Sequence, residues 1–173
     1  MDESIRGIYE MNVDAWKRLE QALDDVTSEE SDWRPVPEAN SINAIIRHLR
    51  IEAAWHVNSL RDGAPMPTIA APVDQDEIDA IPLDFTANLR GLSAHQREYL
   101  DRLSASTPAT LRARTKAAYG NALQSEDRTY FIAYHNAIHL ATHCGQIRML
   151  RNLYRRMRGE PALFVPDNPT YQS

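Results

Sequence analysis

The stretch Tyr134–Leu150, YHNAIHLATHCGQIRML, holds three of the six histidines of this 173-residue chain, each four residues after the last. Residues four apart lie one turn apart on a helix, so His139 and His143 share a face, with Cβ atoms about 6 Å apart. Apolar residues recur around them at helical spacing, which indicates a long helix with imidazoles on a largely buried stripe. Two such imidazoles can converge on one metal ion, which then needs a further ligand from another element.

Helical periodicity predicts four long helices in the whole chain. They cover about residues 4–26, from Ser41 to a stop at Gly63 and Pro65, about 83–104, and from Ser125 to Gly159. A proline- and acid-rich connection precedes the third helix, and a second connection between Pro108 and Gly120 contains weak strand-like pieces. We therefore expect a single all-α domain over residues 1–173, an up-down four-helix bundle with long connecting loops.

Composition excludes several classes of function. The formal net charge of −5 argues against a general nucleic-acid-binding protein. A basic cluster near the C-terminus is interpreted as a solvated helix face that complements the helix dipole: Arg148, Arg151, Arg155, Arg156 and Arg158. No apolar run approaches the roughly 18 residues of a membrane span. A single cysteine and an acidic N-terminus without a following apolar run favour a cytoplasmic protein.

A third ligand candidate lies in the second predicted helix. His48 follows Ile45 on the apolar stripe of that helix, so we expect it to face the core. A lone core histidine is more often structural, but two helices that each present inward histidines favour a metal site inside a bundle. Three imidazoles, from His48, His139 and His143, with an open fourth position are typical of a catalytic metal site.

Two further residues are candidate catalytic groups. Glu52 follows His48 by four residues and shares its face; it is interpreted as a general base, a residue that orients a ligand, an occasional ligand, or a plain surface glutamate. His135 lies one turn before His139 but about 40° further round the helix. We interpret His135 as a residue that supports a ligand or faces the substrate.

The remaining histidines and the cysteine have simpler interpretations. His56 and His95 are expected to be surface or packing residues. Cys144 is rotated by about 100° from His143 and is interpreted as a small buried hydrophobe. Gly145 costs about 1 kcal/mol in a helix interior relative to alanine, which a close approach of a helix or ligand would justify.

These motifs resemble the DinB/YfiT-like superfamily. HLATHCGQIRMLR (residues 139–151) is similar to its signature, H-x-x-x-H-R-G-Q-[IV], and NSINAIIRHLRIEAAW (residues 40–55) is similar to its second-helix pattern. DWRPVPEAN and LFVPDNPTY also resemble segments of this group, so the resemblance spans nearly the whole chain. Cys144 departs from the usual arginine.

The resemblance implies a four-helix bundle that is frequently dimeric, here a homodimer. It also implies a divalent metal bound by His48, His139 and His143. The family includes thiol-dependent transferases and isomerases, hydrolases and members without known activity, so it supports the site better than the reaction.

The leading hypothesis is a metal-dependent enzyme with a small-molecule substrate. An ion with an open position can ionise the thiol of a co-substrate such as bacillithiol, mycothiol or glutathione, which gives thiol (S-)transfer. The same ion can activate water, which gives a hydrolase. A non-catalytic metal-binding bundle and a metal-free bundle with packed histidines are the competing hypotheses. Zinc or nickel is expected first, and iron or manganese also suits imidazole ligands.

Overall fold

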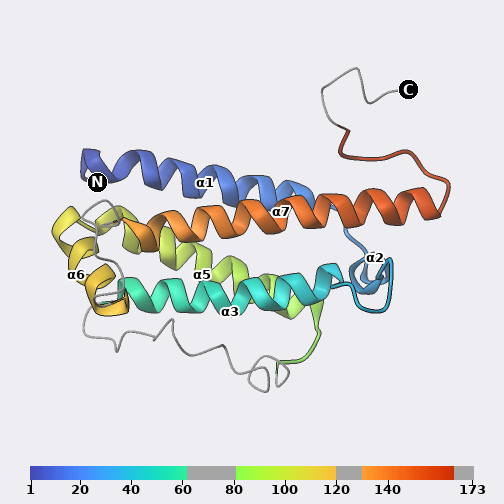
Figure 1. The fold of residues 1–173 in the computed structure, drawn as a ribbon, viewed down its shortest axis with the longest axis horizontal. Coiled ribbons are helices and arrows are strands. Elements are labelled where there is room, and N and C mark those ends of the chain that lie inside the picture. The colour runs from blue at the N-terminus through green and yellow to red at the C-terminus, as the bar shows by residue number, and fades with distance from the viewer. Residues whose placement is uncertain (62–80, 120–129, 166–173) are drawn as a thin grey trace.

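Four long helices form the body of the molecule (Figure 1). The structure is a computed structural model that describes residues 1–61, 81–119 and 130–165. The long helices are α1 (Glu3–Leu23), α3 (Ile42–Leu60), α5 (Phe85–Ala105) and α7 (Phe131–Met157), and the short helices α2 (Ser28–Asp32) and α6 (Pro108–Tyr119) lie between them in sequence. The described residues contain no strand, so the predicted all-helical bundle is confirmed. No helix within these ranges is both long and apolar enough to cross a bilayer.

The long helices run in two parallel pairs, α1 with α7 and α3 with α5, and the pairs are antiparallel to each other (Figure 1). The numbers of contacting residues rise together along both members of a pair. Between α1 and α7, Asn12 contacts Asn136 and Ala22 contacts Arg151. Between α3 and α5, Arg50 contacts Asn88, and Arg61 at the end of α3 contacts Glu98. The directions therefore read up-down-down-up along the chain. The end of α3 and the start of α5 lie at opposite ends of the bundle, which explains why their connection is long.

The core follows the apolar stripes that the sequence predicts. Buried side chains of the expected stripes include Ile5, Ile8, Trp16, Leu19, Ile45, Ile46, Leu49, Leu92, Leu103, Ile147 and Leu150. Full burial of each such side chain stabilises the fold by about 1.5–3 kcal/mol. The apolar spacing of the fourth predicted helix also includes Ile138, Leu153 and Met157, but these three side chains of α7 are exposed. Ile138, for example, follows the buried Asn136 by two residues, a rotation of about 200° that points it outward.

The connection after α5 differs from the strand-like pieces that the sequence suggested. Residues 108–119 form α6 rather than strand-like pieces. The Thr107 hydroxyl accepts a hydrogen bond from the backbone N–H of Thr110, and Pro108 occupies the first helical position, where its missing N–H costs nothing. Leu111 is buried against α3 and α7 residues of the core. Local capping and the burial of Leu111 and Thr115 accompany this helix, although its apolar periodicity is weak.

The helix ends agree only partly with the sequence prediction. α1 ends at Leu23 rather than near residue 26, because Asp25 adopts a left-handed backbone conformation with φ of 57°. α7 ends at Met157 and is followed by Gly159 with φ of 75°, as the glycine predicts. The stop at Gly63 and Pro65 and the cap at Ser125 fall outside the described residues.

Three buried amides join α1, α5 and α7 in the middle of the bundle. Asn136 Nδ2 donates to Asn12 Oδ1 at 2.9 Å and to Gln96 Oε1 at 3.2 Å, and Gln96 Nε2 donates back to Asn136 Oδ1 at 3.1 Å. Asn12 Nδ2 also donates to the Ala133 carbonyl at 2.9 Å. Because these groups are buried, slipping one helix would leave amides without partners, so the network fixes how the helices align.

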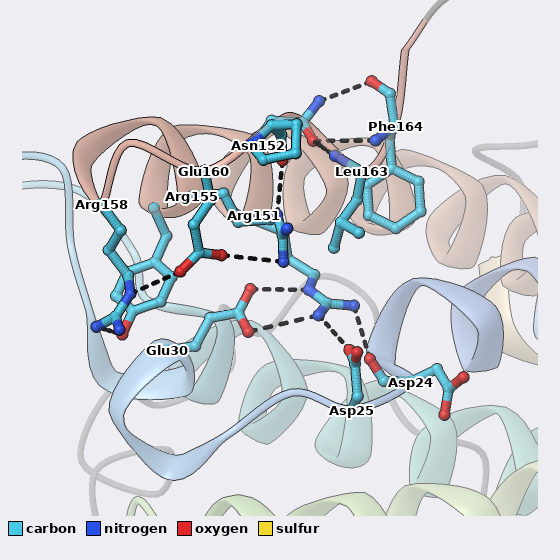
Figure 2. Close-up of polar contacts among 12 residues, drawn as sticks. Asp24, Asp25, Glu30, Arg151, Asn152, Arg155, Arg158, Glu160, Leu163 and Phe164 are labelled. Atoms are coloured by element: carbon cyan, nitrogen blue, oxygen red, sulfur yellow. Dashed lines mark hydrogen bonds and ion pairs between the residues drawn. The ribbon is translucent and has the colours of Figure 1, made fainter.

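A buried arginine joins the far end of α7 to α2 and to the turn that precedes it (Figure 2). Arg151 Nε donates to Glu30 Oε1 at 2.8 Å, and Nη2 donates to Asp25 Oδ1 and to Glu30 Oε2. Nη1 donates to the carbonyls of Ala22 and Asp24 at 3.2 and 2.7 Å. All five N–H groups of the guanidinium are thus used. Arg151 and Glu30 are only 3% and 6% exposed, so the interpretation of the C-terminal arginines as a solvated face is wrong for Arg151.

Removing the Arg151 guanidinium should destabilise the fold. Arg151→Met leaves the Glu30 carboxylate buried without its partner and should lower the free energy of unfolding by about 3–5 kcal/mol. Urea denaturation followed by circular dichroism measures this change. Arg156→Met, at an exposed position of the same helix, is the matched control and should change the value by less than about 0.5 kcal/mol. A Glu30→Gln/Arg151→Met double variant should be more stable than Arg151→Met alone; equal stability of the parent and Arg151→Met would contradict the assignment.

Candidate metal centre

Five histidines meet where α3 crosses α7 in antiparallel direction. His48 and His56 lie two turns apart on α3, and His135, His139 and His143 follow one another by single turns on α7. The ring of His48 lies 5.0 Å from the rings of both His139 and His143, and the ring of His56 lies 5.2 Å from that of His135. The antiparallel register therefore separates the histidines into a trio and a pair.

The trio consists of the three predicted ligands. The Nε2 atoms of His48 and His139 are 3.0 Å apart, and those of His143 and His139 are 3.1 Å apart. One ring nitrogen from each residue lies within 4.8 Å of the other two. All three side chains are half-buried, so the cluster is neither sealed in the core nor free in solvent.

The donor set fits a divalent metal. Tetrahedral ligation with metal–nitrogen distances of about 2.0–2.1 Å separates ligand nitrogens by about 3.3 Å, close to the spacing found here. Three neutral imidazoles cannot satisfy one another, because the single Nε2 of His139 faces two other Nε2 atoms. An ion among them would use all three lone pairs.

Gln146 orients one member of the trio. Its Oε1 lies 2.7 Å from Nδ1 of His143, and since a carbonyl oxygen only accepts, Nδ1 carries the proton. Nε2 of His143 is then an unprotonated lone pair directed at His139. The sequence interpretation assigned no role to Gln146, although its place three residues after His143 puts both on one face of the helix.

Burial keeps the imidazoles neutral. Burial first, and then the neighbouring His143, His48 and His135, together lower the pKa of His139 to about 3. Burial also lowers the pKa of His48 and of His143, although the Gln146 hydrogen bond partly offsets the effect on His143. Neutral imidazole is the form that binds metals, so the site is ready for an ion at neutral pH.

Glu52 lies half-buried on α3, one turn after His48. Burial raises the pKa of its carboxyl group. Its carboxylate oxygens do not join the cluster of ligand atoms formed by the trio. Within the described ranges, no hydrogen bond or ion pair to this carboxylate is found. The carboxylate is therefore free to act on a bound molecule, and its role stays a prediction.

His135 and His56 form the pair beside the trio. His56 Nε2 lies 2.9 Å from His135 Nδ1, and the His135 ring stacks on that of His139 with centroids 5.6 Å apart. His56 is fully buried, so the expectation of a surface position is wrong for it. The sequence interpretation did not connect it with His135, because that link depends on the α3–α7 register.

The Cys144 and Gly145 positions lie away from the cluster. Cys144 is buried, as expected, and its Sγ lies 3.5 Å from the backbone carbonyl of Arg18 on α1. Burial raises the pKa of this thiol, so it is not an activated nucleophile. A Cβ at Gly145 would meet no atom within 4 Å, so among the described residues no close approach explains the glycine.

Comparison with known proteins identifies the family. The DinB superfamily model matches residues 11–147, a range that contains all five of these histidines. The chain belongs to the DinB superfamily. No curated protein and no solved structure matches it. DinB membership and the His48–His139–His143 cluster are together compatible with metal binding.

The metal-free protein should lose stability in acid through His139. Its pKa is about 3 in the folded chain and about 6.5 when unfolded, so between these values the unfolded chain binds a proton that the folded chain does not. Stability should therefore fall as the pH falls from about 6.5 towards 3, and this contribution should be constant above about 6.5. Urea denaturation of chelator-treated protein from about pH 7.5 to about pH 4.5 measures the effect.

His139→Gln is the control for this titration, because glutamine cannot be protonated in this range. The stability of the parent should decline relative to the variant as the pH is lowered. Parallel profiles for the two proteins would show that His139 is not held neutral by the fold.

Proposed function

We propose that His48, His139 and His143 bind a divalent metal ion and that the protein is a metal-dependent enzyme acting on a small molecule. The observation that carries the proposal is the convergence of three Nε2 atoms at 3.0–3.1 Å contacts in a half-buried position. Structural metal sites usually have four protein ligands. Three protein ligands leave a position for water or substrate. Neither Glu52 nor His135 contributes a ligand atom to the cluster, which supports an open position.

The bound ion would act as a Lewis acid that lowers the pKa of a bound thiol or water. Our preferred reaction is thiol (S-)transfer, in which a low-molecular-weight thiol such as bacillithiol, mycothiol or glutathione attacks an electrophilic substrate. Glu52 is the described carboxylate one turn from His48, and its raised pKa suits it to accept the thiol proton. Because Glu52 and His48 lie on the same helix, the proton acceptor stays close to the metal ligand. A reducing, cytoplasmic location would supply such thiols.

Two competing functions differ in what occupies the open position. A hydrolase would use activated water, with Glu52 as the general base. A non-catalytic protein would use the ion only to stabilise the bundle and would complete its coordination sphere with a fourth protein ligand. Imidazole ligands favour zinc or nickel and also suit iron or manganese.

The three histidines should each be needed for metal binding. Purified protein should contain about one zinc or nickel ion per chain, and each of His48→Ala, His139→Ala and His143→Ala should lose it. Elemental analysis after dialysis against the metal measures this. His95→Ala, a histidine of α5 outside the cluster, is the matched control and should keep full occupancy. Equal metal content in the parent and His139→Ala would contradict the site.

Turnover assays separate these functions once metal is bound. Metal-loaded protein with each thiol and a panel of electrophiles should give conjugates, and Glu52→Gln should slow the reaction about 10²–10⁴-fold without releasing the metal. Ester or amide cleavage without a thiol would instead favour the hydrolase. Metal-loaded protein that is inactive in both assays, with no exchangeable water on the ion, would favour the non-catalytic bundle.

We also propose that the chain forms a homodimer through the outward face of α7. Apolar side chains form a stripe there, with 38–61% of their surface exposed: Tyr134, Ile138, Met149, Leu153 and Met157. No aspartate, glutamate, lysine or arginine occurs from Phe131 to Ile147. Gly145 stands at the middle of the stripe with open space above it. An antiparallel second copy would place the two glycines near the two-fold axis, with Ile138 against the partner's Leu153.

A charge in this stripe should break the dimer. Ile138→Glu would place a carboxylate in the apolar interface, so light scattering after size exclusion should change from dimer to monomer mass. Val36→Glu, at a similarly exposed apolar residue between α2 and α3, should leave the dimer intact. A monomeric parent, or a dimeric Ile138→Glu variant, would rule out this interface.

A further inference from the structure

His56 is a buried imidazole whose only hydrogen-bonded side-chain partner in the described chain is another imidazole. It has no exposed surface, and aromatic rings surround it: Trp55 at 4.8 Å, Tyr99 at 5.9 Å and His135 at 5.2 Å between centroids. Burial lowers its pKa well below the usual range, with further lowering from His135 and His139. The ring is therefore neutral and carries one proton. A fully buried polar ring in this position needs a reason, because an apolar side chain would be easier to bury.

The surroundings decide which nitrogen of His56 is protonated. The backbone carbonyl of Glu52, one turn earlier, acts as an acceptor for an N–H of this ring and raises the pKa of His56. Among the described residues, Nδ1 has no other partner and no hydrogen bond of good geometry. Because a carbonyl can only accept, it favours a proton on Nδ1 of His56. Nε2 of His56 is then a lone pair, and it lies 2.9 Å from Nδ1 of His135.

The tautomer of His135 follows from that of His56. A neutral His135 ring carries one proton, and its Nδ1 is the atom that faces Nε2 of His56. Its Nδ1 must donate the proton to the lone pair of His56, because two lone pairs at 2.9 Å would repel. Nε2 of His135, the atom distal to the backbone, is left unprotonated. The ring is stacked on His139, with an angle of 18° between the planes, so this lone pair lies alongside the trio.

We propose that His56 is a positioning residue: it holds His135 with the proton on Nδ1 and so keeps Nε2 of His135 as a hydrogen-bond acceptor beside the metal centre. Nε2 of His135 would accept a hydrogen bond from a hydroxyl or thiol of a bound molecule, or from a bound water. The use of this acceptor in catalysis rests on the proposed function, whereas the proton position does not. His135 would then orient the molecule that enters the open position, and His56 would act only through His135.

Long-range proton–nitrogen NMR of ¹⁵N-histidine-labelled full-length protein tests this directly, because the spectrum distinguishes the two neutral tautomers of each ring. In metal-free and zinc-loaded parent protein, His56 and His135 should both show a protonated Nδ1. A protonated Nε2 on His135 in the parent would overturn the inference, and this measurement needs no variant that could fail to fold.

Two substitutions separate positioning from packing. His56→Gln keeps a carbonyl acceptor near the place of Nε2, and His135 should remain protonated on Nδ1. His56→Leu fills the space without an acceptor, and His135 should shift to the Nε2-protonated form. If the leucine variant is folded by circular dichroism and His135 keeps its proton on Nδ1, His56 does not position it. If the leucine variant does not fold, the glutamine variant and the parent spectrum decide the question.

The outcome is independent of metal binding. A parent protein with the expected tautomers but no bound metal would contradict the proposed function and leave the His56 assignment standing. A parent that binds metal through the trio, with His135 protonated on Nε2, would contradict the His56 assignment and leave the proposed metal site standing. Metal content of His56→Gln should match that of the parent, because His56 does not belong to the ligand cluster.

Discussion

The position of α7 along its neighbours is the constraint on which the candidate site depends. A slip of one residue rotates every side chain of the helix by about 100° and would move His139 and His143 away from His48. Two buried polar contacts prevent this, one on each side of the trio. Asn136 bonds to Asn12 and Gln96 in the middle of the bundle, and Arg151 bonds to Glu30 at the end (Figure 2). Because either contact would leave buried polar atoms unpaired if the helix moved, the two together hold the trio in place.

The trio is itself unfavourable for folding without a ligand. The Nε2 of His139 lies 3.0 and 3.1 Å from the Nε2 atoms of His48 and His143, so the three imidazoles cannot form a complete set of hydrogen bonds, and burial opposes any proton that would relieve them. Such local conflicts occur where function requires them and are supported by the rest of the fold. Here the support comes from apolar packing of all four long helices and from the saturated Arg151 guanidinium. The fold thus holds an arrangement that a metal would complete.

Much of the fold followed from local pattern, and two of the failures share one cause. The four long helices and the three clustered histidines follow from three- and four-residue spacing, which is a property of each segment alone. The burial of Arg151 depends on Glu30, more than a hundred residues away, and a run of arginines at a helix end looks solvated without that partner. The His56–His135 contact depends on the antiparallel register of α3 and α7. The third failure, α6, has a local cause: its apolar periodicity is weak, although Thr107 caps its start. Sequence pattern predicts which face a residue occupies, but not what the facing helix presents.

The surroundings of the trio differ along the bundle axis, and this difference bears on the chemistry. Towards the end of α7, the next inward residues are Ile147 and Leu150, both apolar and buried. Towards its start lies His135, with His56 hydrogen-bonded to it and Glu52 on the same helix as His56. Of these side chains, those that can accept a proton or a hydrogen bond lie on the side of His135, while Gln146, on the other side, already uses its Oε1 to accept from His143. A reaction that releases a proton, as the ionisation of a thiol or of water does, needs such groups next to the open position. The asymmetry favours a catalytic site over an ion that only stabilises the bundle, for which neutral packing on both sides would serve equally well.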